Sequence, residues 1–140
     1  MLTVPNDRNV EDEVRAAFRQ WTAAWNDGNV EGYLDGYWES TDTRQVVSAG
    51  DGHHITRGID AIRAKYREST RKSKEKYGSM GTISLTSMDV RPIELDDAIV
   101  FGEFLFQFDC SNKSTGCFTI HLHRLGDAIG WQIVSEHTAS

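Results

Sequence analysis

The stretch that decides the fold is AIVFGEFLFQF at residues 98–108, followed by CFTIHLHRL at 117–125 and WQIVSEH at 131–137. Apolar and polar residues alternate in these segments, which are rich in aromatic and β-branched residues, as is typical of β-strands. Short runs of Gly, Ser, Asn and Asp separate them, and such residues form turns. ISLTSMDV at 83–90 has the same alternation. The pattern therefore predicts a series of long antiparallel strands.

The two faces of these strands differ in polarity, because successive side chains of a strand point to opposite sides. One face is strongly apolar and carries Val100, Phe104, Phe106, Phe108, Phe118, Ile120 and Leu122. The other is mixed and carries Ile99, Phe101, Glu103, Thr119, His121 and His123. In the last strand, Trp131, Ile133, Ser135 and His137 alternate against Gln132, Val134 and Glu136. We expect helices on the apolar face and a homodimer interface on the mixed face, where Trp131 and Phe101 would otherwise be exposed.

Helical patterns precede the strands. Val14, Phe18, Trp21 and Trp25 form one apolar stripe at helical spacing, and Asn9 is a suitable N-cap. A shorter helix is predicted within residues 28–38, a small hairpin within 44–56, and a third helix from residue 59 that ends before the basic run at 67–77. Helices followed by antiparallel strands predict an α+β fold, with about three N-terminal helices packed on one side of the sheet. We expect residues 1–8 to form a flexible arm and residues 9–140 a single domain.

Composition excludes several classes of protein. The chain has 140 residues and a net charge of −6, from 15 Lys and Arg against 21 Asp and Glu. A nucleic-acid-binding domain has the opposite balance, so we expect no nucleic-acid partner. No apolar run is long enough to span a membrane, and the N-terminus lacks the pattern of a signal peptide. The expected location is therefore the cytoplasm, with no membrane partner.

Three residues are candidates for acid–base chemistry. Glu103 lies among aromatic residues, where a carboxyl group has a raised pKa, although it can equally pair across a dimer interface. His137 can transfer protons near neutral pH or can anchor the last strand through hydrogen bonds. Asp35 lies on the predicted second helix. His121 and His123 have a spacing that suits metal ligands, but no further ligand motif accompanies them, so we predict no metal and no cofactor.

Aromatic residues point to a small-molecule pocket. Apolar walls with a few polar groups are the usual make-up of such a site, and the alternative is that the tryptophans only fill the core. The residues expected to line the pocket are Trp21, Trp25, Tyr33, Tyr37, Trp38, Phe104, Ile120 and Leu122.

Four segments carry a resemblance to a known family: WTAAWNDGNVEGYLDGYWES at 21–40, TRG at 56–58, MGTISL at 80–85 and GWQIVSEHTAS at 130–140. Together they resemble the nuclear-transport-factor-2-like superfamily, in particular its SnoaL-like branch. The C-terminal part also resembles the association domain of calcium/calmodulin-dependent protein kinase II. The resemblance implies a cone-shaped, cystatin-like fold with a strongly curved sheet, a pocket inside the cone, and a homodimer through the outer sheet face.

The superfamily includes isomerases, cyclases, dehydratases and assembly domains without chemistry, so fold alone does not choose a function. The kinase association domains carry a pocket arginine directly after the final histidine and another on the preceding strand. The matching positions here are Thr138 and Ile120. We therefore predict a homodimeric domain that binds an unidentified small organic ligand in an apolar pocket, with no assignable turnover. The alternative is a cofactor-independent acid–base enzyme of the isomerase, cyclase or dehydratase type, which would need a carboxylate or histidine inside the cone.

Overall fold

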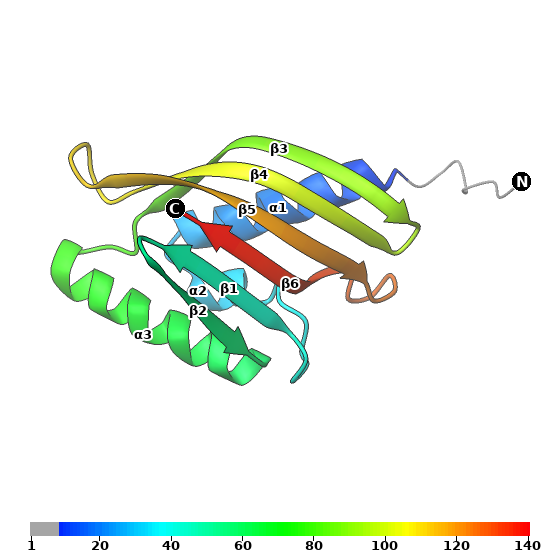
Figure 1. Ribbon diagram of the computed structural model, residues 1–140, viewed down its shortest axis with the longest axis horizontal. Helices are drawn as coiled ribbons and strands as arrows, with labels where there is room; N and C mark the ends of the chain where they lie inside the picture. The colour runs from blue at the N-terminus through cyan, green and yellow to red at the C-terminus, as the bar shows by residue number, and fades with distance from the viewer. Residues whose placement is uncertain (1–8) are drawn as a thin grey trace, which may run out of the picture.

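The computed structural model describes residues 9–140, in which helices pack on one face of a six-stranded sheet (Figure 1). The arm expected at residues 1–8 lies outside the described residues. The elements are, in chain order, α1 (Val10–Asn26), α2 (Val30–Leu34), β1 (Arg44–Ala49), β2 (Gly52–Arg57), α3 (Ile59–Tyr77), β3 (Thr82–Glu94), β4 (Asp97–Gln107), β5 (Lys113–Arg124) and β6 (Trp131–Ala139).

The strand order across the sheet is β2-β1-β6-β5-β4-β3. Each neighbouring pair is antiparallel except β1 and β6, which run parallel. The long strands β3, β4 and β5 arch over α1, and α3 lies across the other end of the sheet (Figure 1). The predicted α+β fold, with helices on a curved and mostly antiparallel sheet, is confirmed. No helix within residues 9–140 is long and apolar enough to cross a membrane.

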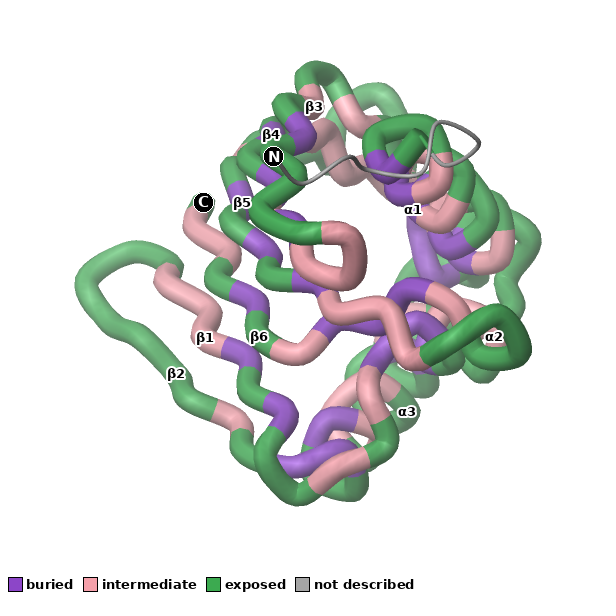
Figure 2. Tube along the Cα trace, turned by 90° about the vertical axis from the view of Figure 1, so that its right-hand side faces the viewer, coloured by how far each residue is buried: buried purple, intermediate pink, exposed green. Residues whose placement is uncertain are grey.

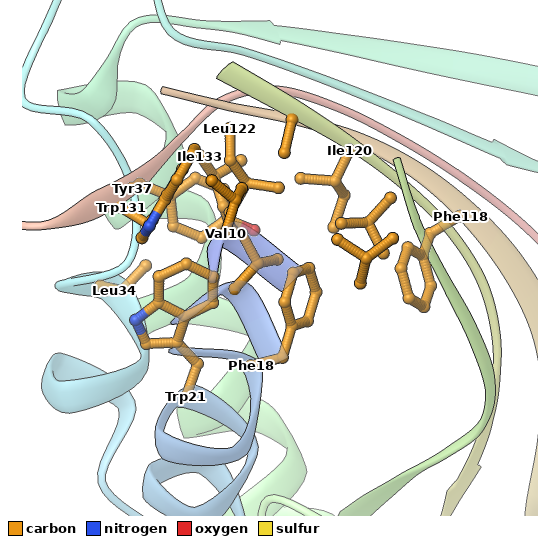
Figure 3. Packing of buried hydrophobic residues seen from close by; sticks show 14 of the residues in the cluster. Val10, Phe18, Trp21, Leu34, Tyr37, Phe118, Ile120, Leu122, Trp131 and Ile133 are labelled. Atoms are coloured by element: carbon orange, nitrogen blue, oxygen red, sulfur yellow. The ribbon is translucent and has the colours of Figure 1, made fainter. Parts of the chain in front are cut away.

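Helix α1 forms as the sequence predicts. The Asn9 side chain accepts a hydrogen bond from the Asp12 backbone N–H at 3.1 Å, which satisfies one of the free donors of the first turn. Gly28 follows the helix with a φ of 78°, a conformation that glycine adopts without strain. The apolar stripe of α1 faces the sheet, where Phe18 stacks on Phe118 of β5 with ring centroids 5.9 Å apart (Figure 3). This packing fixes the distance between helix and sheet beside the cavity described below.

Helix α3 is longer than predicted. It continues through the basic run to Tyr77 instead of ending before it. Arg71 lies 2.6 Å from a carboxylate oxygen of Glu68 and 2.7 Å from one of Glu75, so acidic residues spaced three and four positions away support the helix through this run. Gly78 then ends the helix in a left-handed conformation with φ 79°. Side chains on the last turns of α3 can therefore reach the cavity.

Strand β6 departs from the predicted alternation at one position. Leu122 of β5 pairs with Ile133 and His121 pairs with Ser135, which leaves Val134 as the extra residue of a β-bulge. An extra residue reverses the faces of everything that follows it. Glu136 is consequently buried and His137 exposed. Figure 2 shows buried and exposed positions alternating along β6 and its neighbours. The prediction that Ile133 and His137 share a face is wrong for this reason. Trp131, which the prediction places on the mixed outer face, is instead buried, and its Nε1 donates to Glu13 Oε1 at 2.9 Å.

The bulge is held by the chain segment that follows α2. The backbone N–H of Ile133 donates to the carbonyl of Gly36 at 2.8 Å, and the Ile133 carbonyl accepts from the N–H of Trp38 at 3.0 Å. These bonds form a short parallel bridge between Tyr37 and Ile133. Contacts distant in sequence therefore set which residues of β6 face inward.

Candidate functional site

A cavity of about 300 Å³ lies between α1, α3 and the inner face of the sheet. Its walls are mostly aromatic and aliphatic, with a few hydroxyl groups and one carboxyl group. The residues that line it include Trp21, Trp25, Tyr33, Tyr66, Phe104, Phe106, Phe118, Ile120, Glu136 and Thr138. Cavities of small-molecule sites usually measure about 300–1,000 Å³, so this one suits a compact ligand.

The structure brings together most of the residues expected to line a pocket. The expected residues that border the cavity are Trp21, Trp25, Tyr33, Phe104 and Ile120. Tyr37 lies behind the cavity wall, where its hydroxyl contacts Glu136. Leu122 is fully buried in the hydrophobic core, and Trp38 is half-buried at the bridge to β6. These three residues support the wall without forming it.

None of the three acid–base candidates lies at the cavity. Glu103 is exposed on the outer sheet face, where its carboxylate accepts a hydrogen bond from Ser87 Oγ at 2.9 Å. His137 is exposed on the same face, with Nε2 3.0 Å from Ser48 Oγ. Asp35 ends α2 and borders a separate groove on the far side of α1. The strand alternation places Glu103 outward and the β-bulge places His137 outward.

The carboxyl group that does line the cavity is Glu136, which no candidate set from the sequence contained. Only 7% of its surface is exposed. Its Oε1 atom accepts hydrogen bonds from Tyr37 Oη at 2.6 Å and from Gln45 Nε2 at 2.7 Å. Burial raises the pKa of Glu136, and these hydrogen bonds together with the charge of Lys65 oppose the rise. The sequence carries no mark of the bulge, so only the register could have revealed this residue.

Gln45 connects the carboxyl group to its surroundings. Its Nε2 also donates to Tyr66 Oη at 2.6 Å, and its Oε1 accepts from the ammonium group of Lys65. These contacts assign the two ends of the Gln45 amide, since only the nitrogen can donate. Desolvation lowers the pKa of Lys65, which is half-buried on α3. A hydrogen-bonded path thus runs from a surface lysine through one amide to the buried carboxyl group.

Three tyrosines surround this end of the cavity. The hydroxyl groups of Tyr33 and Tyr66 each lie 3.4 Å from that of Tyr37. Burial raises the pKa of Tyr66 to about 12, and it raises the pKa values of Tyr33 and Tyr37 well above the ordinary range. All three hydroxyl groups therefore keep their protons at neutral pH and can act as hydrogen-bond donors.

Trp25 closes the aromatic wall. Its ring meets that of Tyr33 edge-on, with centroids 5.0 Å apart at an angle of 73°. Its Nε1 atom is buried and has no hydrogen-bond partner among residues 9–140. An unpaired buried donor costs about 1–3 kcal/mol, so side chains placed in this way are more typical of functional sites than of closed cores.

The outer sheet face carries a histidine cluster. His121 Nε2 and His123 Nδ1 lie 3.1 and 2.9 Å from the same oxygen of Asp97. Burial alone would raise the pKa of Asp97, but the hydrogen bonds from both histidines outweigh that effect and lower it. Within the described part of the chain, no group of three or more His, Cys, Asp or Glu side chains is arranged to hold a metal ion.

Comparison with solved structures places the fold. A nuclear-transport-factor-2-like protein of unknown function from Shewanella oneidensis is similar with a TM-score of 0.75 and 21% identity, over 93% of this chain and 98% of that one. A cystatin-like fold protein from Burkholderia xenovorans is similar with a TM-score of 0.68 and 24% identity, over 96% and 93% of the two chains. The chain therefore has the cystatin-like fold of nuclear-transport-factor-2-like proteins, as the resemblance of its sequence predicted.

A third similar structure comes from Xanthomonas campestris and is described as a candidate calcium/calmodulin-dependent protein kinase II association domain. Its TM-score is 0.66 and its identity 18%, over 99% of this chain and 92% of that one. No protein-family model matches the sequence, and a search of curated proteins returns no match. Because fold alone does not define an activity, the function has to be argued from the cavity.

Proposed function

We propose that this chain is a homodimeric domain that binds a small, largely apolar organic molecule in the cavity between its helices and its sheet. The observation that carries the proposal is the lining itself. Aromatic rings from α1, α2, α3, β4 and β5 surround the space, and polar groups converge at one end, around Glu136. An apolar enclosure with a few fixed polar groups binds a ligand through burial and orients it through hydrogen bonds.

The charges of the lining residues limit which class of ligand the cavity can bind. Of the described residues that border the cavity, Glu136 alone belongs to a charged type. Ile120 and Thr138 border it at the positions where the kinase association domains, by the resemblance, carry arginines. A carboxylate or phosphate ligand would find no cation there and would be repelled by Glu136. The proposal therefore favours neutral ligands.

Thermal melting against neutral two-ring aromatic and alicyclic compounds tests the binding. A ligand at about 100 times its dissociation constant adds about 2.7 kcal/mol to the free energy of unfolding, which raises Tm by a few degrees. Leu85→Phe narrows the cavity and should abolish the shift, whereas Ile129→Phe, at a position 61% exposed, should keep it. A flat response across the panel, at concentrations where weak ligands would be detected, contradicts the proposal.

The proposed dimer uses the outer sheet face. Phe101 on β4 is 46% exposed, and such a large apolar side chain is usually covered by a partner. The structural similarity to a candidate association domain supports self-association of this chain. We place the dimer in the cytoplasm, where Cys110 and Cys117, which are free thiols here, remain reduced.

One observation favours a second function, acid–base catalysis without a cofactor. Glu136 is a carboxyl group inside the apolar cavity, and burial raises its pKa towards the range in which a carboxylate acts as a general base. A two-ring ketone such as 2-indanone, incubated with the protein in heavy water, should then exchange the hydrogens next to its carbonyl group for deuterium. If the unmodified chain exchanges these hydrogens no faster than Glu136→Gln does, the catalytic function is contradicted. The binding function is unaffected by that result.

A further inference from the structure

We propose that the polar end of the cavity recognises a hydroxyl group on the bound molecule: Glu136 Oε2 accepts a hydrogen bond from it, and Tyr66 Oη donates one to it. The inference rests on the proposed binding function and names the chemical class of its ligand. The supporting observation is that the hydrogen bonds of the free protein leave one acceptor and one donor at this end of the cavity without a close partner among residues 9–140.

The two carboxyl oxygens of Glu136 differ in their hydrogen bonds. Tyr37 and Gln45 both donate to Oε1, and no hydrogen bond within residues 9–140 reaches Oε2. Oε2 belongs to a side chain that borders the cavity. A carboxylate oxygen accepts up to two hydrogen bonds, so Oε2 is an acceptor that a ligand can satisfy.

The hydroxyl proton of Tyr66 is available to a ligand. Gln45 Nε2 has two hydrogens, and its two short contacts direct one to Glu136 Oε1 and the other to Tyr66 Oη. Tyr66 is thus an acceptor towards Gln45, and its own proton is left for another partner. The nearby Tyr37 Oη lies 3.4 Å from Tyr66 Oη, which is long for a hydrogen bond between hydroxyl groups. A ligand oxygen in the cavity would be a better partner, because good O–H···O bonds measure about 2.5–3.0 Å.

The Glu136 carboxyl group and the Tyr66 hydroxyl group share one hydrogen-bond donor. Gln45 Nε2 is 2.7 Å from Glu136 Oε1 and 2.6 Å from Tyr66 Oη, so a single amide nitrogen spans the two groups. Lys65 holds the other end of that amide and keeps its orientation fixed. An alcohol or phenol offers both a proton and an acceptor oxygen on one atom. An ether offers only the acceptor, and a carboxylate adds a charge that Glu136 repels.

The test is isothermal titration calorimetry at neutral pH with three probes: 2-naphthol, 2-methoxynaphthalene and 2-naphthoate. We expect 2-naphthol to bind about tenfold more tightly than the ether, a difference of about 1.4 kcal/mol, because only the naphthol can donate a hydrogen bond to Glu136 Oε2. Binding of 2-naphthoate should be too weak to measure. Equal affinities for naphthol and ether would overturn the inference.

Glu136→Gln sharpens the test. The amide can keep an oxygen towards Tyr37 and Gln45, and it then presents an N–H to the cavity in place of Oε2. The preference should reverse, so that the ether binds at least as tightly as 2-naphthol. The matched control, Glu94→Gln, removes an exposed carboxylate at the far end of β3 and should leave both affinities unchanged. A naphthol preference that survives Glu136→Gln also overturns the inference.

Tyr66→Phe gives an independent readout, which remains available if Glu136→Gln does not fold by circular dichroism. Loss of the donor should weaken 2-naphthol and the ether alike, by about five- to tenfold for one neutral hydrogen bond. Unchanged affinities for both probes would overturn the role of Tyr66. If none of the probes binds and the melting panel is flat as well, the proposed binding function fails, which is distinct from binding without hydroxyl preference.

Discussion

The surroundings of Glu136 disfavour the charged form of its carboxyl group. Burial raises its pKa above the value it has in the unfolded chain, although Tyr37, Gln45 and Lys65 oppose that shift. The titratable groups that face it are Tyr33, Tyr37, Tyr66 and Lys65, and none of the tyrosines supplies charge at neutral pH. A carboxyl group kept in such a place reduces stability and is typical of functional sites.

The sign of the resulting pH dependence follows from the raised pKa. Below the unfolded-state pKa the carboxyl group is protonated in both states and its burial costs little. As pH rises through the unfolded and then the folded pKa, the folded state binds the proton more strongly, and stability is lost. We therefore predict that Tm of Glu136→Gln, relative to the unmodified chain, increases between pH 4 and pH 7.

Differential scanning calorimetry across this pH range measures the effect. Glu103→Gln serves as the control, because it removes one negative charge from the exposed outer face without touching the cavity. The prediction would be contradicted if the difference in Tm between Glu136→Gln and the unmodified chain stayed constant or fell with rising pH. The protein would then stabilise the charged form of Glu136 more than burial of the side chain indicates.

At the scale of elements, the end of α1 is tied to β3 by one side chain. Asn26 Nδ2 donates to the carbonyl of Ile83 at 2.9 Å, and Asn26 Oδ1 accepts from the Ile83 N–H at 2.8 Å. The amide thus pairs with the outermost strand as another backbone segment would. Because β3 is an edge of the sheet, this pairing supports the wall of the cavity to which Ile83 and Leu85 belong.

We predict that Asn26→Ala lowers the free energy of unfolding by about 1–2 kcal/mol, the value expected for two hydrogen bonds of average strength. Asn26→Asp should cost a similar amount, because it keeps the acceptor for the Ile83 N–H and places a second oxygen against the Ile83 carbonyl. Urea denaturation measures both. Asn112→Ala, in the exposed β4–β5 turn, is the comparison variant. Losses below about 0.5 kcal/mol for both Asn26 variants would mean that water replaces the pairing.

At the scale of the whole molecule, the outer sheet face is the surface that a second copy would cover. The strand registers align Phe101, Thr119, His137, Val46 and Ile55 in one row across β4, β5, β6, β1 and β2. The row combines large apolar side chains with hydroxyl and imidazole groups. A two-fold dimer would bring each row against its copy, so that every substitution acts twice.

We predict that Phe101→Ser weakens the dimer by at least about tenfold, because truncating an aromatic side chain that an interface buries can cost about 2 kcal/mol or more. Analytical ultracentrifugation over a range of concentrations measures the dissociation constant. Ile129→Ser changes an equally apolar and more exposed side chain in the β5–β6 loop, away from the sheet face, and should have no effect. A monomer at all concentrations for the unmodified chain would exclude the dimer outright.

Local sequence patterns are enough to predict the class of fold and most of its elements. The stripe of Val14, Phe18 and Trp21 required a helix with one buried face, and the alternation in residues 98–108 required a half-buried strand. Each pattern reports a local periodicity, which depends only on the geometry of one element. For the same reason Phe104 and Ile120 could be expected on the inner face, where the structure places them.

Which carboxyl group lines the cavity depends on contacts between distant parts of the chain. Alternation alone puts Ile133 and His137 on one face of β6, but the bulge at Val134 separates them, so that Glu136 and not His137 lines the cavity. Backbone hydrogen bonds from Gly36 and Trp38, about a hundred residues away, hold that bulge. A local pattern cannot contain such a constraint, because a strand's register is set by its neighbours and a slip of one residue turns every later side chain to the opposite face.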